Sequence, residues 1–223
     1  MRTRFRIAAL VLASFCTNGA SADDRLAGDA GLGATTDGRL LLKYTVECAL
    51  PPGEKLHTKR RGKNVVLKGS LGLAPAWKHE ALSEVDQRWM TACILARINA
   101  FGVAVQLSMR ADRPALRDGM DAAELRNYAF EEGAFYGNLF ADPPVLYACA
   151  GSGGVQSAPT KRLRVCTDAN ENGTAMNRCG MEMTGSCAQV CDAHDEHQGF
   201  YRGCSGGGHR YDEVVTVFLK TAR

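Results

Sequence analysis

The chain has 223 residues, of which 45% are hydrophobic and 23% are charged, and these proportions are typical of a soluble globular protein. No apolar run reaches the roughly 18 residues that a membrane-spanning helix needs, so we expect no transmembrane span. The formal net charge of +3 includes Arg2, Arg4 and Arg6, which precede an expected cleavage site. Removing these three from the 27 basic residues leaves 24, equal to the 24 acidic residues. A balanced charge argues against nucleic acid as a partner.

The first 22 residues have the pattern of a secretory signal peptide. The three arginines form a charged start, residues 7–15 form a short apolar stretch, and Ala20-Ser21-Ala22 is an A-x-A cleavage site. We therefore expect a secreted or periplasmic protein whose mature chain begins at Asp23. The alternative is a lipoprotein anchored through an acylated Cys16.

Removal of Cys16 leaves eight cysteines, an even number that predicts four disulfide bonds behind an export signal. Two lie early in the chain and six lie within residues 149–204, so we expect Cys48 to bond Cys93. The pairing of the later six stays open. The sequence contains no C-x-x-C pair, which is the spacing typical of zinc sites and of thiol redox enzymes, so it favours neither kind of chemistry. The eight are Cys48, Cys93, Cys149, Cys166, Cys179, Cys187, Cys191 and Cys204.

Residues 23–38 are small, polar and rich in glycine, which predicts a flexible leader. Residues 39–49 and 64–71 are predicted strands, and Pro51-Pro52-Gly53 ends the first. A basic stretch lies between the two strands, with Gly62 at the expected turn. It is either an anion-binding patch or a solvated hairpin tip, and the absence of interleaved aromatic residues favours the tip. Its basic residues are Lys55, His57, Lys59, Arg60, Arg61 and Lys63.

Two helices are predicted next. Ser83 can cap the first, which runs to about Ala100, and one of its faces is apolar and carries Cys93 inward. The residues of that face are Leu82, Val85, Trp89, Ala92, Cys93 and Ala96. Asp121 and Glu124 form a capping box for the second helix, which we expect to end near Gly133.

Two further strands are predicted. Residues 103–110 alternate in a way that favours a half-buried strand with Val103, Val105, Leu107 and Met109 facing inward. Residues 214–219 are continuously apolar, which favours a central strand that returns to the sheet begun by the N-terminal strands.

Together these elements predict one disulfide-stapled α+β domain, with a mainly antiparallel sheet, two helices and a C-terminal cysteine-rich elaboration. The expected divisions are a signal peptide at 1–22, a leader at 23–38, the core at 39–148, the elaboration at 149–213 and the closing strand at 214–223.

The segment 128–147 holds six aromatic residues with Glu131 and Glu132 among them. If the second helix reaches Gly133, both carboxylates lie in its last turn, where the helix dipole disfavours negative charge. The pair is therefore a candidate acid/base site, and Phe135, Tyr136 and Asn138 are candidate ligand-binding residues that would suit a carbohydrate. The alternative is that the aromatic residues form core and that distant arginines pair the glutamates.

Asp168, Asn170 and Asn172, followed by Gly173, match the start of a calcium loop. The twelfth position, where an EF-hand needs glutamate, is Cys179, so the motif is incomplete. Asn, Asp and Gly also form ordinary turns, and we expect no cofactor unless calcium binds here.

Two other patterns have weaker support. His194 and His197 lie among acidic residues and resemble metal ligands, although a polar helix end beside a disulfide explains them as well; the acids are Asp192, Asp195 and Glu196. The residues Gly203-Cys204-Ser205-Gly206-Gly207 match a nucleophile elbow in letters only, because no strand-to-helix turn is expected there.

Gln87-Arg88-Trp89 with Cys93, followed by the run at 131–140 (EEGAFYGNLF), resembles an uncharacterised family of secreted, cysteine-containing bacterial proteins. The resemblance implies bacterial export and no particular activity or ligand.

The sequence as a whole favours a non-catalytic binding or structural module of the cell exterior over an enzyme. Such a module would present the aromatic segment or the basic hairpin to an extracellular or envelope ligand. The alternative is a small secreted hydrolase, directed at glycans, that uses Glu131 or Glu132.

Overall fold

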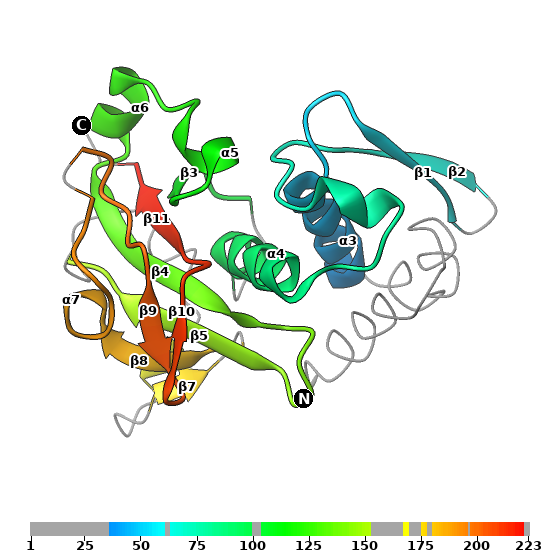
Figure 1. The fold of residues 1–223 in the computed structure, drawn as a ribbon. Helices are drawn as coiled ribbons and strands as arrows, with labels where there is room; N and C mark the ends of the chain where they lie inside the picture. The colour runs from blue at the N-terminus through cyan, green and yellow to red at the C-terminus, as the bar shows by residue number, and fades with distance from the viewer. Residues whose placement is uncertain are drawn as a thin grey trace. The chain divides into compact units, whose positions relative to one another are not determined.

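The computed structural model describes residues 36–60, 63–99, 104–152, 167–169, 175–177, 180–195 and 197–220. These residues form helices and mostly antiparallel sheets, so the predicted α+β class is confirmed (Figure 1). The chain divides into two compact units, which are Met1–Ile94 with Asn138–Pro144, and Leu95–Gly137 with Val145–Arg223. No helix in the described part of the chain has the length and apolar character needed to cross a membrane. The expected division into a core at 39–148 and an elaboration at 149–213 stays a prediction.

The first unit combines helices with one β-hairpin. Its elements are α3 (Thr36–Ala49), β1 (Lys55–Arg60), β2 (Lys63–Lys68), the 3-10 helix η2 (Pro75–Lys78) and most of α4 (Glu84–Arg97). The helix α4 begins where predicted, and the hydroxyl of Ser83 accepts a hydrogen bond from the backbone N–H of Asp86 at 3.1 Å. A Cys48–Cys93 disulfide links α3 to α4, so the expected bond is confirmed.

The prediction of a strand at 39–49 is wrong, because this segment is the helix α3. Burial follows the helical period, with Val46, Ala49 and Leu50 fully or almost fully buried and Lys43 exposed. Lys43 and Glu47 stand one turn apart with 3.6 Å between their charged atoms. The apolar run therefore has period 3.6, and the helix ends just before Pro51 as the proline signal predicted.

The predicted apolar face of α4 is largely correct. Trp89, Ala92, Cys93 and Ala96 are all buried. Val85 is the exception, because it lies in the first turn and is 48% exposed.

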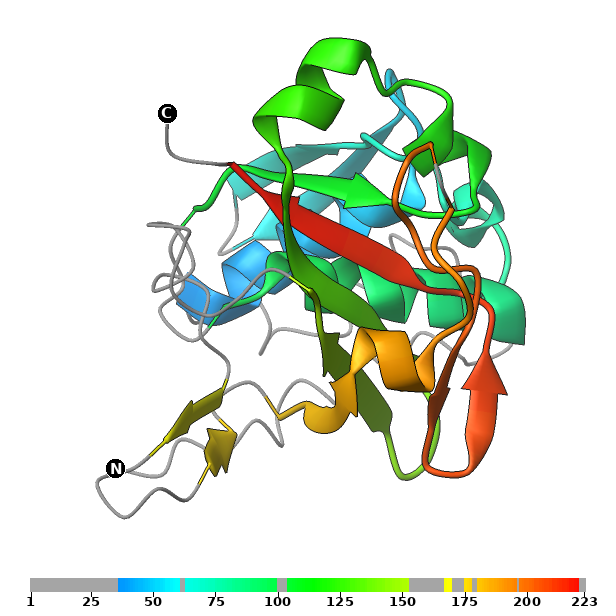
Figure 2. The same cartoon turned by 90° about the vertical axis from the view of Figure 1, so that its left-hand side faces the viewer.

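The second unit is organised around a five-stranded sheet in the order β3-β11-β4-β5-β8. Its strands are β3 (Leu107–Arg110), β4 (Phe130–Asn138), β5 (Val145–Ala150), β8 (Glu182–Ser186) and β11 (Val215–Leu219). β11 runs antiparallel between β3 and β4 (Figure 2). All five of its residues are buried. The predicted central position of the last strand is thus confirmed. The expectation that the N-terminal strands share its sheet is wrong, because β1 and β2 form a separate two-stranded sheet.

The remaining elements of this unit are short. They are α5 (Pro114–Arg117), α6 (Ala122–Asn127), β6 (Thr167–Ala169), β7 (Ala175–Asn177), α7 (Cys187–Val190), β9 (Cys204–Gly206) and β10 (His209–Tyr211). β6 pairs with β7 and β9 pairs with β10, both antiparallel.

The strand β3 is shorter than predicted, and its inward face is the opposite of the one expected. Ser108 and Arg110 are buried, whereas Leu107 and Met109 are only half-buried. Arg110 can be buried because its guanidinium lies 3.7 Å from the ring centre of Phe218 and reaches two backbone carbonyls.

The second predicted helix is shorter than expected, and its proposed end at Gly133 is wrong. Asp121 caps it, since its carboxylate accepts from the backbone N–H of Glu124 at 2.7 Å, but the helix ends at Asn127. The chain then enters β4, where Gly137 adopts φ +127° and a Cβ would overlap the Val145 carbonyl oxygen. Gly133, which was expected to end the helix, lies in the same strand, where a Cβ would overlap the Cys149 carbonyl oxygen. Both glycines therefore allow close approach of the neighbouring strand.

Among the described residues of the second unit, Cys149 is bonded to Cys187 and Cys191 to Cys204. Cys166 and Cys179, the remaining two of the expected eight, lie outside the described residues.

Candidate functional site

The β1-β2 hairpin presents one strongly basic face. Residues two apart on a strand point to the same side, so Lys55, His57 and Lys59 share a face, and the register places Lys68, Val66 and Asn64 opposite them. All six are exposed. The other face carries Leu56, which is buried, so the hairpin packs with one side and leaves the basic side in solvent.

No acidic residue occurs anywhere in the hairpin sequence from Lys55 to Lys68. Within the described part of the chain, none of Lys55, Lys59, Lys63 and Lys68 forms an ion pair. The acid just before the hairpin, Glu54, is paired instead with Lys78 at 2.5 Å. That hydrogen bond and charge hold the pKa of Glu54 below its usual range, so Glu54 stays ionised and engaged with Lys78.

Lys55 and Lys68 lie directly opposite each other in the antiparallel register. Like charges in directly opposed positions destabilise a sheet. A local rule broken on an exposed surface marks a candidate functional site. The opposed lysines therefore make the hairpin a candidate functional site.

A cavity of 150 Å³ lies at the base of this hairpin within the same unit. It is lined by Leu50, Pro51, Glu54, Pro75, Lys78 and His79. The Glu54–Lys78 ion pair forms part of its wall, so its main charges neutralise each other.

The second candidate centre is the carboxylate of Glu131 on β4, which is only 4% exposed. Its Oε1 accepts from the Tyr201 hydroxyl at 3.0 Å and its Oε2 from the Ser152 hydroxyl at 2.9 Å. The Nε2 of His194 lies 3.4 Å from Oε2, and the His194 ring packs 4.2 Å from that of Tyr201 between centroids. A buried carboxylate with several polar partners needs no further compensation for its burial.

The surroundings of Glu131 raise the pKa of Tyr201 well above its ordinary value. Burial is the main cause, and the neighbouring Glu131 charge adds to it by disfavouring a second negative charge. Tyr201 therefore stays protonated and acts as a hydrogen-bond donor. Among the described residues that contact the Glu131 carboxylate, Ser152 and His194 are exposed, the His194 side chain to 36%.

Glu132 is placed differently from Glu131. The register of β4 against β11 passes from Gly133 to Glu131 and skips Glu132, which is a β-bulge. Glu132 is half-buried there. The argument that both glutamates strain a helix end is wrong, because neither lies in a helix.

The candidate ligand-binding residues of the aromatic segment are part of the core. Phe135, Tyr136 and Asn138 are at most 7% exposed. The Tyr136 hydroxyl contacts Thr184 and the Ser205 carbonyl, and Asn138 contacts Gln87. In this structure the three residues offer no open face to a carbohydrate.

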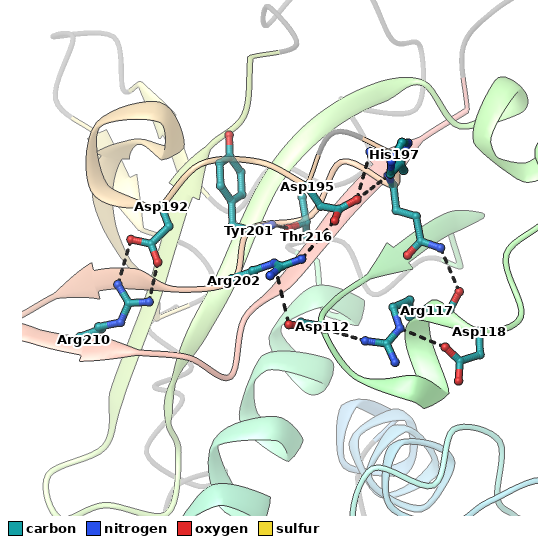
Figure 3. Close-up of polar contacts among 11 residues, drawn as sticks. Asp112, Arg117, Asp118, Asp192, Asp195, His197, Tyr201, Arg202, Arg210 and Thr216 are labelled. Carbon is teal, nitrogen blue, oxygen red and sulfur yellow. Dashed lines mark hydrogen bonds and ion pairs between the residues drawn. The ribbon is translucent and has the colours of Figure 1, made fainter.

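The acidic residues near His194 are engaged in separate ion pairs and turns, as Figure 3 shows. The Asp192 carboxylate accepts hydrogen bonds from both terminal nitrogens of Arg210. Asp195 accepts from the backbone N–H groups of His197 and Gln198, which together with Arg202 lower its pKa, the Gln198 bond being the largest cause. The helix α7 ends at Val190, before these acidic residues and His194. These contacts favour the structural interpretation of the cluster; Glu196 lies outside the described residues.

Two further predictions concern residues that the structure describes only in part. Asp168 is the middle residue of β6, whereas Asn170, Asn172 and Gly173 lie outside the described residues. Calcium binding therefore stays a prediction. The elbow-like segment forms the strand β9, followed by a turn and β10, with Cys204 in a disulfide. No helix follows Ser205 there, as expected.

The sequence missed the partners of Glu131 because they lie far along the chain. Ser152 and Tyr201 follow Glu131 by 21 and 70 residues. No local spacing could have indicated these contacts, whereas the basic hairpin was visible as a run of cations without acids.

Comparison of the chain with protein-family models, with curated proteins and with solved structures finds no match. The family resemblance noted in the sequence therefore stays a prediction.

Proposed function

We propose that this protein is a non-catalytic binding module of the cell exterior, secreted or periplasmic, which holds an anionic ligand on the exposed basic face of the β1-β2 hairpin. The observation that carries the proposal is the opposed pair Lys55 and Lys68, with Lys59 and His57 on the same face and no acid in the hairpin. Three disulfides support export, because such bonds persist in oxidising compartments.

An extended polyanion suits this face better than a small anion. Lys55 and Lys59 lie along β1 and Lys68 lies opposite them on β2, and same-face side chains are about 6.6–6.8 Å apart along each strand, twice the rise per residue. The face has no enclosing walls among its six residues, so affinity would come from several weak contacts along a charged polymer. Val66, which is 47% exposed between these cations, adds an apolar contact.

The test is binding of heparin, a sulfated polysaccharide that serves as the probe polyanion, to the oxidised mature protein. We expect affinity to fall steeply with salt, by roughly fortyfold between 50 and 200 mM if the three lysines of this face release counterions as they do on a polyanion charged like DNA. Lys55→Gln combined with Lys59→Gln should weaken binding and lower the salt slope by about two.

A matched control separates the hairpin from net charge. Lys220→Gln combined with Arg126→Gln removes two exposed cations outside the hairpin and should leave binding almost unchanged. Equal loss in both double variants would show that only the overall charge matters, and binding that resists salt would also contradict the proposal. Neutral dextran should not bind.

A second candidate function is hydrolysis at Glu131, directed at glycans. The observation in its favour is the 2.9 Å contact from the Ser152 hydroxyl to the Glu131 carboxylate, which would let this carboxylate take a proton from an exposed hydroxyl. Hydrolysis of a panel of glycan substrates should then be lost in Glu131→Gln and persist in Glu132→Gln. Activity that survives Glu131→Gln would exclude this centre.

A further inference from the structure

The helix α7 brings two cysteines to the same place. Cys187 opens the helix and Cys191 follows one turn later, with its backbone N–H donating to the Cys187 carbonyl at 2.9 Å. Cys191 is the C-cap residue and has an extended backbone, so it lies just past the end of the helix. The sulfurs of both residues are close to Cys149 on the adjacent strand β5.

The two disulfides of this region are in contact. Cys149 Sγ is bonded to Cys187, yet it also lies 3.5 Å from Cys191 Sγ, which is bonded to Cys204. The sulfurs of Cys149, Cys191 and Cys204 all lie within 4.8 Å of one another. A separation of 3.5 Å is a non-bonded contact distance, so no large backbone movement separates the observed pairing from a Cys149–Cys191 pairing.

We propose that these two bonds form a thiol–disulfide exchange site that reacts with an external dithiol and then exchanges partners internally. Cys191 is the point of entry, because it is half-buried, whereas Cys149, Cys187 and Cys204 are at most 2% exposed. The four sulfurs then have two competing arrangements around Cys149.

The reaction has two stages, which are reduction of the Cys191–Cys204 bond by the dithiol and then internal exchange. A thiolate of the dithiol attacks Cys191 Sγ, the bond to Cys204 breaks, and Cys204 leaves as a thiolate that takes a proton. The second thiol of the reagent then attacks its own sulfur in the mixed disulfide. It releases the Cys191 thiolate and leaves as a cyclic disulfide, so two electrons pass to the protein.

The second stage, the internal exchange, involves no net redox change. The Cys191 thiolate attacks Cys149 Sγ, the Cys149–Cys191 bond forms, the Cys149–Cys187 bond breaks, and Cys187 leaves as a thiolate. The product holds one disulfide on Cys149, as before, but its partner has moved by one helical turn.

The test uses the Cys204→Ser variant of the full mature chain, which leaves Cys191 as a thiol beside the Cys149–Cys187 bond. After incubation at pH 8.5 with a metal chelator, acid quenching and alkylation, peptide mapping should find the thiol on both Cys187 and Cys191. We expect at least about a tenth of the molecules to carry Cys149–Cys191, because the two pairings differ little in geometry. The exchange should be roughly fiftyfold slower at pH 6.5, following the thiolate fraction of an ordinary cysteine.

The matched control is Cys93→Ser, which frees Cys48 in the other compact unit, and there the thiol should remain on Cys48. A second measurement does not depend on the folding of the variant. The unmodified protein is treated with a limiting amount of dithiol and mapped in the same way. Cys149–Cys191 together with alkylated Cys187 and Cys204 supports the proposal. Loss of either bond with the other left in its original pairing overturns it, as does a thiol found only on Cys191 in the variant.

Discussion

The sheet of the second unit and the hairpin of the first place charged side chains in opposite kinds of surroundings. In the second unit the charges near the sheet have close partners: Glu131 has Tyr201 and Ser152, and the guanidinium of Arg110 donates to the carbonyls of Gln198 and Tyr128. In the hairpin of the first unit the lysines stand in solvent and two of them oppose each other. Because burial demands partners and exposure does not, the polar groups of the second unit explain stability, and those of the hairpin are available for a ligand.

The comparison also shows why an unusual charge is informative only where its surroundings are known. Glu131 seemed anomalous because it was assigned to a helix end, and the anomaly disappears once the residue lies in a strand with three polar contacts. The Lys55–Lys68 pair becomes anomalous only when the register is known.

The largest expected effect concerns the disulfide bonds within each unit. Replacing Cys48 and Cys93 with serine opens a separation of 45 residues, and chain-entropy arguments give a loss of about 4 kcal/mol in the free energy of unfolding. Removing Cys191–Cys204, with a separation of 13, should cost about 3 kcal/mol by the same reasoning. Urea unfolding of the two double-serine variants measures the difference, and a reversed order would show that strain or packing, not loop length, governs these bonds.

The second prediction tests whether the buried guanidinium of Arg110 in the second unit contributes to the stability of the fold. Arg110→Met keeps an apolar stem beside Phe218 but leaves the part-buried carbonyls of Gln198 and Tyr128 without this donor. We expect a loss of about 3 kcal/mol in urea unfolding, because hydrogen bonds to a charged group are worth about 1.5–3 kcal/mol each and only part of this is recovered by solvent.

The control for this prediction is Arg126→Met, which changes an exposed arginine of α6 and should alter the free energy of unfolding by less than about 0.5 kcal/mol. Similar losses in both variants would contradict a specific role for Arg110. Burial already lowers the pKa of the Arg110 guanidinium, so desolvation, not exposure, characterises its environment.

Much of the fold could be predicted where local signals agree. The start of α4 at Ser83, the cap at Asp121 and the buried strand β11 follow from capping and patterning. The segment 39–49 was misassigned because three successive leucines fit either period, and packing of α3 through Val46 and Cys48 decided for the helix. The strand β4 was missed because its glycines are required by the approach of β5, a contact that no local pattern shows.

Candidate sites were harder to predict than elements. The basic hairpin was found because its signal is compositional, although its strands were expected on either side of the basic stretch and instead contain it. The buried state of Tyr136 could not be predicted, since an aromatic cluster has the same sequence in a core as in a binding site.

The third prediction distinguishes the two glutamates. Glu131→Gln replaces one carboxylate oxygen with an amide that cannot accept from both Tyr201 and Ser152, so we expect a loss of about 2 kcal/mol. Glu132→Gln, at the half-buried bulge position, should cost less than Glu131→Gln. Thermal or urea unfolding measures both variants. A neutral or stabilising Glu131→Gln would mean that the carboxylate is strained, and would strengthen the case for catalysis at this residue.

The smallest expected effect bears most directly on the hairpin. Lys68→Glu places a carboxylate opposite Lys55 and converts a repulsive cross-strand pair into an attractive one, so it should raise the free energy of unfolding by about 0.2–1 kcal/mol. The same change reverses one charge on the basic face and should weaken heparin binding more than Lys68→Gln does. Lys59→Glu is the control, because Lys59 faces Asn64 and gains no opposed cation, so it should weaken binding with a smaller gain in stability. A protein that retains two facing lysines at a cost to its own stability is expected if those lysines bind a ligand. If Lys68→Glu lowered stability, or left heparin binding intact, the opposed lysines would have a structural role and the proposed binding face would lose its main support.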